Sequence, residues 1–134
     1  MRAVLDPNVL ISALLAPKGA PGQVLAKWVI GEFELVVSPL LLAELERALA
    51  YPKLRERIAP DDAADFVSFL EGAAVAASDQ EAPAARSSDP GDDYLLALAE
   101  QAKAVLVSGD QHLLDLVDRF PVRSPRKFLD ELER

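Results

Sequence analysis

The sequence predicts an α/β fold, a three-layer α/β/α sandwich around a central, mostly parallel sheet of about five strands. Short apolar segments rich in strand formers alternate with helical segments along the whole chain, and strands connected through helices pair in parallel. No internal repeat or long linker divides the 134 residues, so residues 1–134 are expected to form a single domain. A hydrophobic fraction of 51% with 27% charged residues is ordinary for a globular protein.

In the first half of the chain, two strands and their helices are marked by local signals. The run after Ser38 has a typical helix start, with serine as N-cap and Pro39 at the first helical position, and Gly31 is expected to end the helix before it. Pro and Gly mark residues 16–22 as a loop. Strands are expected over 2–5 and 33–37, and helices over 9–15, 23–30, 39–50, 53–58 and 60–71.

The second half repeats the alternation. A polar stretch with Pro, Ser and Gly, residues 78–91, is the longest expected loop. Strands are expected over 73–77, 104–107 and 122–123, and helices over 92–103, 111–118 and 125–133.

Composition excludes several classes of protein. The chain has no cysteine, which excludes disulfides, thiolate metal sites and a cysteine nucleophile, and fits a cytoplasmic protein. No apolar stretch approaches the ~18 residues of a membrane span. With a net charge of −8, the chain lacks the excess of basic residues that non-specific nucleic-acid binding requires. Taken alone, this charge counts against a polynucleotide substrate.

Four acidic residues occupy positions where ligands gather in α/β folds. Asp6 and Asp110 follow the first and fourth expected strands, and ligands bind outside the carboxyl ends of such strands. Glu44 lies beside the apolar stripe of its helix, and Asp93 lies in the first turn of another. Each has an alternative explanation as a helix-capping, first-turn or solvent-facing acid, and Asp89 and Asp92 are assigned mainly to capping.

Taken together, the four acids predict a cation site. Two unit charges ~4 Å apart repel by roughly 4 kcal/mol at an effective dielectric of ~20. Several such pairs would rival the ~5–15 kcal/mol stability of a domain unless a cation neutralised them. Oxygen-only ligands favour Mg²⁺ or Mn²⁺ over zinc.

Four motifs in this order resemble a PIN domain, most closely the bacterial and archaeal PIN proteins assigned as toxins of toxin–antitoxin systems, relatives of the VapC ribonucleases. The motifs are LDPNVLISALL (5–15), SPLLLAELERAL (38–49), DPGDDYLLALA (89–99) and LVSGDQHLL (106–114). The resemblance covers essentially the whole chain. It implies a PIN-like fold and cleavage of RNA that depends on one or two Mg²⁺ or Mn²⁺ ions.

The resemblance also assigns residues. It places Asp6, Glu44, Asp93 and Asp110 on the family's acidic, metal-holding and catalytic positions, and Asn8 and Ser108 on supporting positions. Two departures stand out. Pro7 replaces the family's usual Thr or Ser, and Asp92 competes with Asp93 for the third acidic position.

Partners follow from the same resemblance. The substrate would be RNA, a protein antitoxin would hold the toxin inactive, and relatives commonly form homodimers. If metal ions supply positive charge the chain need not be basic, and local cations such as Lys53, Arg55 and Arg57, or Arg123, Arg126 and Lys127, would position the RNA backbone or simply face solvent.

Two other functions remain open at this stage. A PIN-like protein that has lost activity would act as a binding module, although retention of all four acids argues against it. A receiver-like signalling domain also places acids at strand ends, but VLVSGD (105–110) lacks the lysine that such a domain needs late in its sheet.

Overall fold

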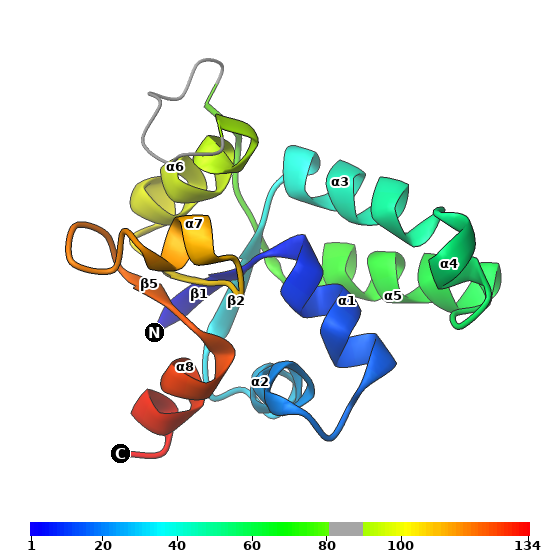
Figure 1. Ribbon diagram of the computed structural model, residues 1–134, viewed down its shortest axis with the longest axis horizontal. Coiled ribbons are helices and arrows are strands. Elements are labelled where there is room, and N and C mark those ends of the chain that lie inside the picture. The colour runs from blue at the N-terminus through cyan, green and yellow to red at the C-terminus, as the bar shows by residue number, and fades with distance from the viewer. Residues whose placement is uncertain (81–89) are drawn as a thin grey trace.

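The computed structural model, which describes residues 1–80 and 90–134, contains a parallel sheet with the strand order β3-β2-β1-β4-β5 (Figure 1). Every pairing in it is parallel, which confirms the predicted fold class. The strands are β1 (Arg2–Leu5), β2 (Glu34–Val37), β3 (Val75–Ala76), β4 (Val105–Val107) and β5 (Val122–Arg123).

The first two helices, α1 (Pro7–Leu15) and α2 (Ala20–Val29), both begin earlier than the sequence predicted. The expected loop over 16–22 is shorter because Pro21 fits the first turn of α2. Gly22 allows this helix to approach the preceding segment, since a Cβ atom there would lie 2.1 Å from the carbonyl oxygen of Pro17. Gly31, with a φ of 87°, follows the helix end as expected.

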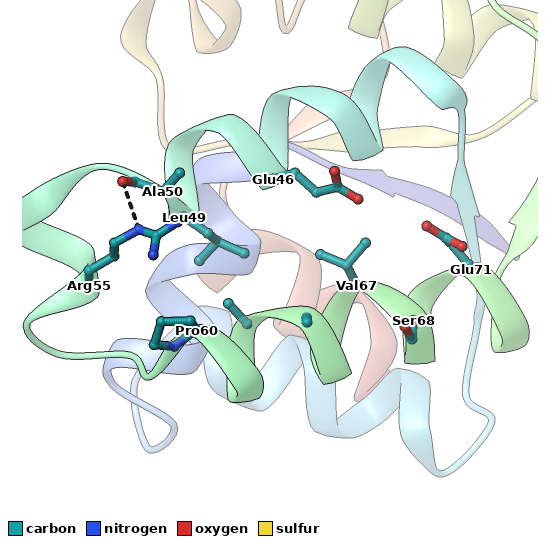
Figure 2. Close-up of a pocket in the computed structure, with 10 residues that line it drawn as sticks. Glu46, Leu49, Ala50, Arg55, Pro60, Val67, Ser68 and Glu71 are labelled. Carbon is teal, nitrogen blue, oxygen red and sulfur yellow. Dashed lines mark hydrogen bonds between the residues drawn. The ribbon is translucent and has the colours of Figure 1, made fainter.

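Three helices follow β2, close to their predicted positions: α3 (Pro39–Leu49), α4 (Pro52–Arg55) and α5 (Pro60–Ala73). Ser38 caps α3, accepting a hydrogen bond from the backbone N–H of Leu41 at 3.2 Å. A hollow of about 350 Å³ lies between α3 and α5 (Figure 2). None of the predicted site acids lines it, so it is separate from the candidate site.

The C-terminal part contains the 3₁₀ turn η1 (Pro90–Asp92), α6 (Asp93–Ala102), α7 (Gln111–Leu114) and α8 (Pro125–Leu132). Helix α7 is shorter than the predicted 111–118 because the chain continues in tighter turns, such as the bond from the Leu116 N–H to the Leu113 carbonyl. Most of the predicted loop over 78–91, including Asp89, lies outside the described residues.

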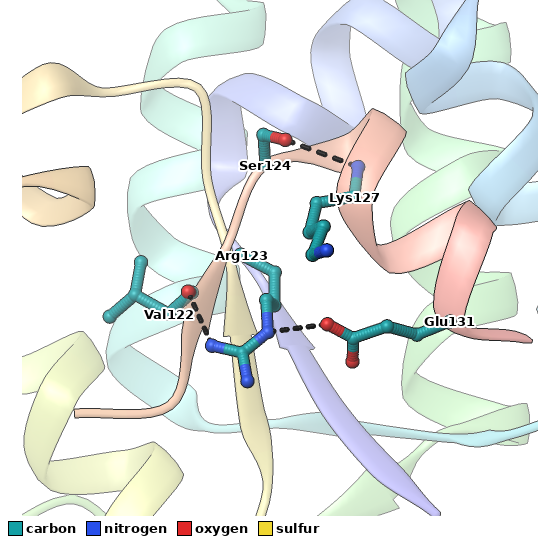
Figure 3. Close-up of polar contacts among 5 residues, drawn as sticks. All are labelled: Val122, Arg123, Ser124, Lys127 and Glu131. Atoms are coloured by element: carbon teal, nitrogen blue, oxygen red, sulfur yellow. Dashed lines mark hydrogen bonds and ion pairs between the residues drawn. The ribbon is translucent and has the colours of Figure 1, made fainter. Parts of the chain in front are cut away.

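The strand β5 and helix α8 are joined by an ion pair. The Arg123 Nε donates to Glu131 Oε1 at 2.6 Å, and its Nη1 donates to the Val122 carbonyl (Figure 3). This cation, which the sequence suggested for RNA positioning, is therefore engaged within the fold.

Helices cover both faces of the sheet (Figure 1). Helix α6 contacts β1 and β4, whereas α1, α2, α3, α5 and α8 contact one another across the other face. The central strand β1 is almost entirely buried, so its carboxyl end is held rigidly between the two helical layers. This is the end at which Asp6 follows.

Among the described residues, no single helix is long and apolar enough to cross a membrane. Helices α1 and α2 reach that length and composition only as a pair, and they meet at 98°.

Candidate active site

The candidate site lies where the direction of strand addition changes. From β1 the chain proceeds to β2 on one side, while β4 pairs with β1 on the other side. At the carboxyl ends of the two strands, the Asp6 N–H donates to the Val107 carbonyl at 3.0 Å and so keeps the two strand ends together. Open parallel sheets bind ligands at this kind of switch point.

Asp6 is buried, with 5% of its surface exposed, and both of its carboxylate oxygens accept hydrogen bonds. Oδ1 accepts from the Asn8 N–H at 3.0 Å and thereby caps α1. Oδ2 accepts from the Ser108 hydroxyl at 2.8 Å. Pro7 occupies the first helical position, where a backbone N–H would have no helical partner in any case. Asp6 therefore caps α1 with one oxygen while its other oxygen is bound at the end of the sheet by Ser108.

Ser108 links the ends of β1 and β4. Its fully buried hydroxyl donates to Asp6 and accepts from the Asp110 N–H at 2.9 Å. Asp110 in turn caps α7, with Oδ1 accepting from the His112 N–H at 2.9 Å. Ser108 thus fixes the Asp6 carboxylate and the backbone of Asp110 together.

Glu44 reaches the site from α3 and is held there by a residue that the sequence reasoning missed. Its Oε2 accepts a hydrogen bond from the Tyr94 hydroxyl at 2.8 Å. Tyr94 is only 8% exposed. Burial and the hydrogen bond to Glu44 raise the pKa of Tyr94 above its ordinary value, so the phenol stays protonated and donates. The one available signal was a tyrosine inside an apolar helix directly after Asp93.

Three of the predicted acids line one small cavity. Asp6, Glu44 and Asp92 face a space of about 220 Å³, whose other lining residues are Pro7, Asn8, Arg47, Ala48 and Tyr51. Asp110 instead lines a neighbouring hollow of about 320 Å³, and Asn8 borders both spaces. Asp93 is buried in the first turn of α6 and lines neither of them. The cavity therefore contains Asp92 rather than Asp93.

The surroundings of Asp6 disfavour its ionised form and raise its pKa. Burial is the largest cause that raises its pKa above the ordinary value of 3.8; Asp110 and Glu44 add to the rise through their negative charges. The hydrogen bonds from Asn8 and Ser108 oppose it without cancelling it. A cation near Asp6 would relieve this unfavourable charge.

The acidic residues around Asp6 fit a magnesium site with one or two carboxylate ligands, but not a site in which three or more carboxylates surround the ion. Among the described residues, no group of three or more His, Cys, Asp or Glu side chains is close enough to hold a metal ion. The four predicted acids therefore do not form a preassembled cage. Magnesium is commonly held by one or two carboxylates and keeps several of its waters, and the buried Asp6 carboxylate, which shares a cavity with Glu44 and Asp92, fits that arrangement.

Comparisons with known proteins give the family. The chain is 28% identical to the uncharacterized protein MJ1680 of Methanocaldococcus jannaschii, over all of this chain and 93% of that protein. Its fold is similar to a chain in the structure of VapBC-1 from nontypeable Haemophilus influenzae, with a TM-score of 0.63, 15% identity, and coverage of 95% of this chain and 100% of that one. The family model of the PIN domain matches residues 2–112. The chain therefore belongs to the PIN domain family.

Proposed function

We propose that this protein is a metal-dependent endoribonuclease that hydrolyses RNA phosphodiester bonds. The observation that carries the proposal is the buried Asp6 carboxylate, positioned between β1 and β4 by Ser108 and opening on a cavity that it shares with Glu44 and Asp92. PIN domains are typically nucleases, and this cavity supplies the hard oxygen donors that Mg²⁺ or Mn²⁺ prefers.

In this proposal Asp6 is the primary metal ligand, with Glu44, Asp92 and Asp110 as further ligands or orienting groups. Asp92 takes precedence over Asp93 because Asp92 lines the cavity. When bound, the ion supplies activation of water and stabilisation of charge on the attacking and leaving oxygens.

The protein side chains have separate tasks. Ser108 holds one oxygen of Asp6, and the backbone of Asn8 holds the other, so the carboxylate keeps a fixed direction. Tyr94 occupies Oε2 of Glu44, which leaves Oε1 to orient the attacking water and accept its proton.

We further propose that the protein is the toxin of a toxin–antitoxin system. The similarity in fold to a chain of VapBC-1 supports this, together with the PIN domain match. A protein antitoxin would then be its partner, self-association as a homodimer would be expected, and the cytoplasm would be the place of action.

The test is cleavage of a panel of end-labelled single-stranded RNAs with Mn²⁺, with Mg²⁺ and with EDTA. We expect cleavage with either metal and none with EDTA. Cleavage that continues in EDTA would refute the metal dependence. If no RNA is cut with any metal, the protein is a PIN domain that serves as a binding module, an outcome for which the lack of a preassembled three-carboxylate group among the described residues gives a specific reason.

Replacing Tyr94 with phenylalanine should lower the rate of cleavage by about 10- to 100-fold, the usual effect of losing a group that orients a metal-site residue. The ring would still fill its place in the core, so the free energy of unfolding should change by only about 1 kcal/mol. Cleavage rates and thermal unfolding of the Tyr94→Phe variant measure the two effects. An unchanged rate would show that the hydrogen bond to Glu44 does not serve the reaction.

A further inference from the structure

The cavity beside Asp6 has a basic and an aromatic residue on its rim that the proposed chemistry does not use. Arg47 lies three residues after Glu44 on α3, and Tyr51 lies two residues beyond the end of that helix. Residues three apart on a helix are neighbours on its surface, so Glu44 and Arg47 face the same space. Both Arg47 and Tyr51 line the cavity together with Asp6 and Asp92.

The guanidinium of Arg47 is available for a ligand. Within the part of the chain that the structure describes, it forms no ion pair or hydrogen bond; Glu44, its neighbour on the helix, bonds with Tyr94 instead. Other basic side chains are engaged: Arg2 pairs with Glu34, Lys27 with Glu32 and Arg123 with Glu131, and Arg55 donates to the Ala50 carbonyl. Among the residues that line the cavity, Arg47 is the one with a positively charged side chain.

Tyr51 presents an exposed ring on a fixed backbone. The residue is 60% exposed, although it is a large aromatic residue. Its N–H donates to the Ala48 carbonyl at 3.1 Å, and its own carbonyl accepts from the N–H groups of Leu54 and Arg55 at 3.0 Å. The junction of α3 and α4 thus fixes the backbone that carries the ring, and the ring lines the cavity without being buried.

We propose that Arg47 and Tyr51 form the nucleotide-binding rim of the cavity, in which the guanidinium binds a backbone phosphate and the phenol ring stacks on an unpaired base. The cavity's carboxylates repel the phosphates that flank a scissile bond, so an acidic protein needs a local cation at this position. An exposed aromatic ring binds a base only when that base is unstacked from its neighbours. The rim therefore binds unpaired nucleotides, an inference that rests on the proposed function for the role of the cavity.

The test measures binding separately from cleavage. Fluorescence anisotropy of a labelled 12-nucleotide oligouridine RNA in EDTA reports binding without turnover, and a blunt RNA duplex of the same length is the comparison. Wild type should bind the single strand more tightly than the duplex. Tyr51→Ala should weaken binding of the single strand by about 5- to 100-fold, while Tyr51→Phe, which keeps the ring, should stay within about twofold of wild type.

Arg47 is tested through the salt dependence of the same binding. Loss of one phosphate contact should make the slope of log K against log salt concentration shallower by about 0.7 for Arg47→Ala. Arg119→Ala is the matched control, because Arg119 is also exposed but precedes β5 and does not line the cavity. This control should leave the slope unchanged.

The outcomes separate this inference from the proposed function. If wild type cuts RNA with Mn²⁺ but the Tyr51 and Arg47 variants bind and cut as wild type does, the proposed role of the rim is wrong and the proposed nuclease function is supported. If wild type cuts no RNA, and its RNA binding nevertheless depends on both residues, the proposed role of the rim is supported and the proposed nuclease function is wrong. Equal slope changes for Arg47→Ala and Arg119→Ala, or no RNA binding by wild type, would overturn the rim and leave this surface to a protein partner.

Discussion

Replacing Asp6 with asparagine should abolish Mn²⁺-dependent cleavage of RNA, with a loss of more than about 100-fold, because groups that merely support a metal ligand already cost 10- to 100-fold when removed. The substitution keeps the shape of the side chain and its cap on α1, since asparagine is as good an N-cap as aspartate. It removes the negative charge and replaces the oxygen that accepts from the Ser108 hydroxyl with an amide N–H donor, toward which Ser108 can turn a lone pair. Initial rates over a range of Mn²⁺ concentrations would measure the loss.

The stability of the same variant should move in the opposite direction. Burial and the charges of Asp110 and Glu44 raise the pKa of Asp6, so the ionised carboxylate opposes folding when no metal is bound. Asp6→Asn should therefore unfold at a higher temperature than wild type in EDTA at neutral pH. Asp61→Asn, in the exposed first turn of α5, is the charge-matched control and should cut RNA normally. An inactive variant that is also less stable would indicate damage to the fold rather than loss of a ligand.

The parts of the site that the sequence predicted are those set by local structure. Asp6 and Asp110 cap helices that directly follow strands, so strand and cap signals a few residues apart placed them at the same edge of the sheet. Ser108 joins them because β1 and β4 are neighbours in the sheet. Local sequence signals were sufficient to place the two acids at strand ends, whereas Ser108 was assigned only through the resemblance to PIN domains.

The parts that the sequence missed or left open depend on how helices pack. Tyr94 reaches Glu44 across 50 positions of sequence, through the approach of α6 to α3, and no local pattern encodes that contact. The choice between Asp92 and Asp93 depends on the rotation of the first turn of α6, where one position separates a residue lining the cavity from a buried one. A periodicity argument with an error of one residue cannot resolve this difference.

A divalent cation should stabilise the folded protein at neutral pH and have little effect in acid. Because the folded-state pKa of Asp6 is raised above its ordinary 3.8, the folded protein binds a proton at Asp6 more tightly than the unfolded chain does. Without metal, Asp6 therefore costs no stability below pH 3.8, and its destabilising effect grows as the pH rises through the folded-state pKa. A cation binds the ionised form, so it reverses this loss only above that pKa.

At a Mn²⁺ concentration of 100 times Kd, the gain should be about 2.7 kcal/mol, which corresponds to a rise in Tm on the order of 10 °C for a domain of this size. Thermal unfolding with Mn²⁺ and with EDTA at pH 7.5, and again at about pH 4, would measure it. Other carboxylates also titrate in this range, so the effect assigned to Asp6 is the difference between wild type and Asp6→Asn. A rise in Tm that is equal at both pH values, or that persists in Asp6→Asn, would place the cation elsewhere on the protein. A rise that is lost in wild type at about pH 4, and lost in Asp6→Asn at pH 7.5, would identify Asp6 as the residue through which metal binding stabilises this fold.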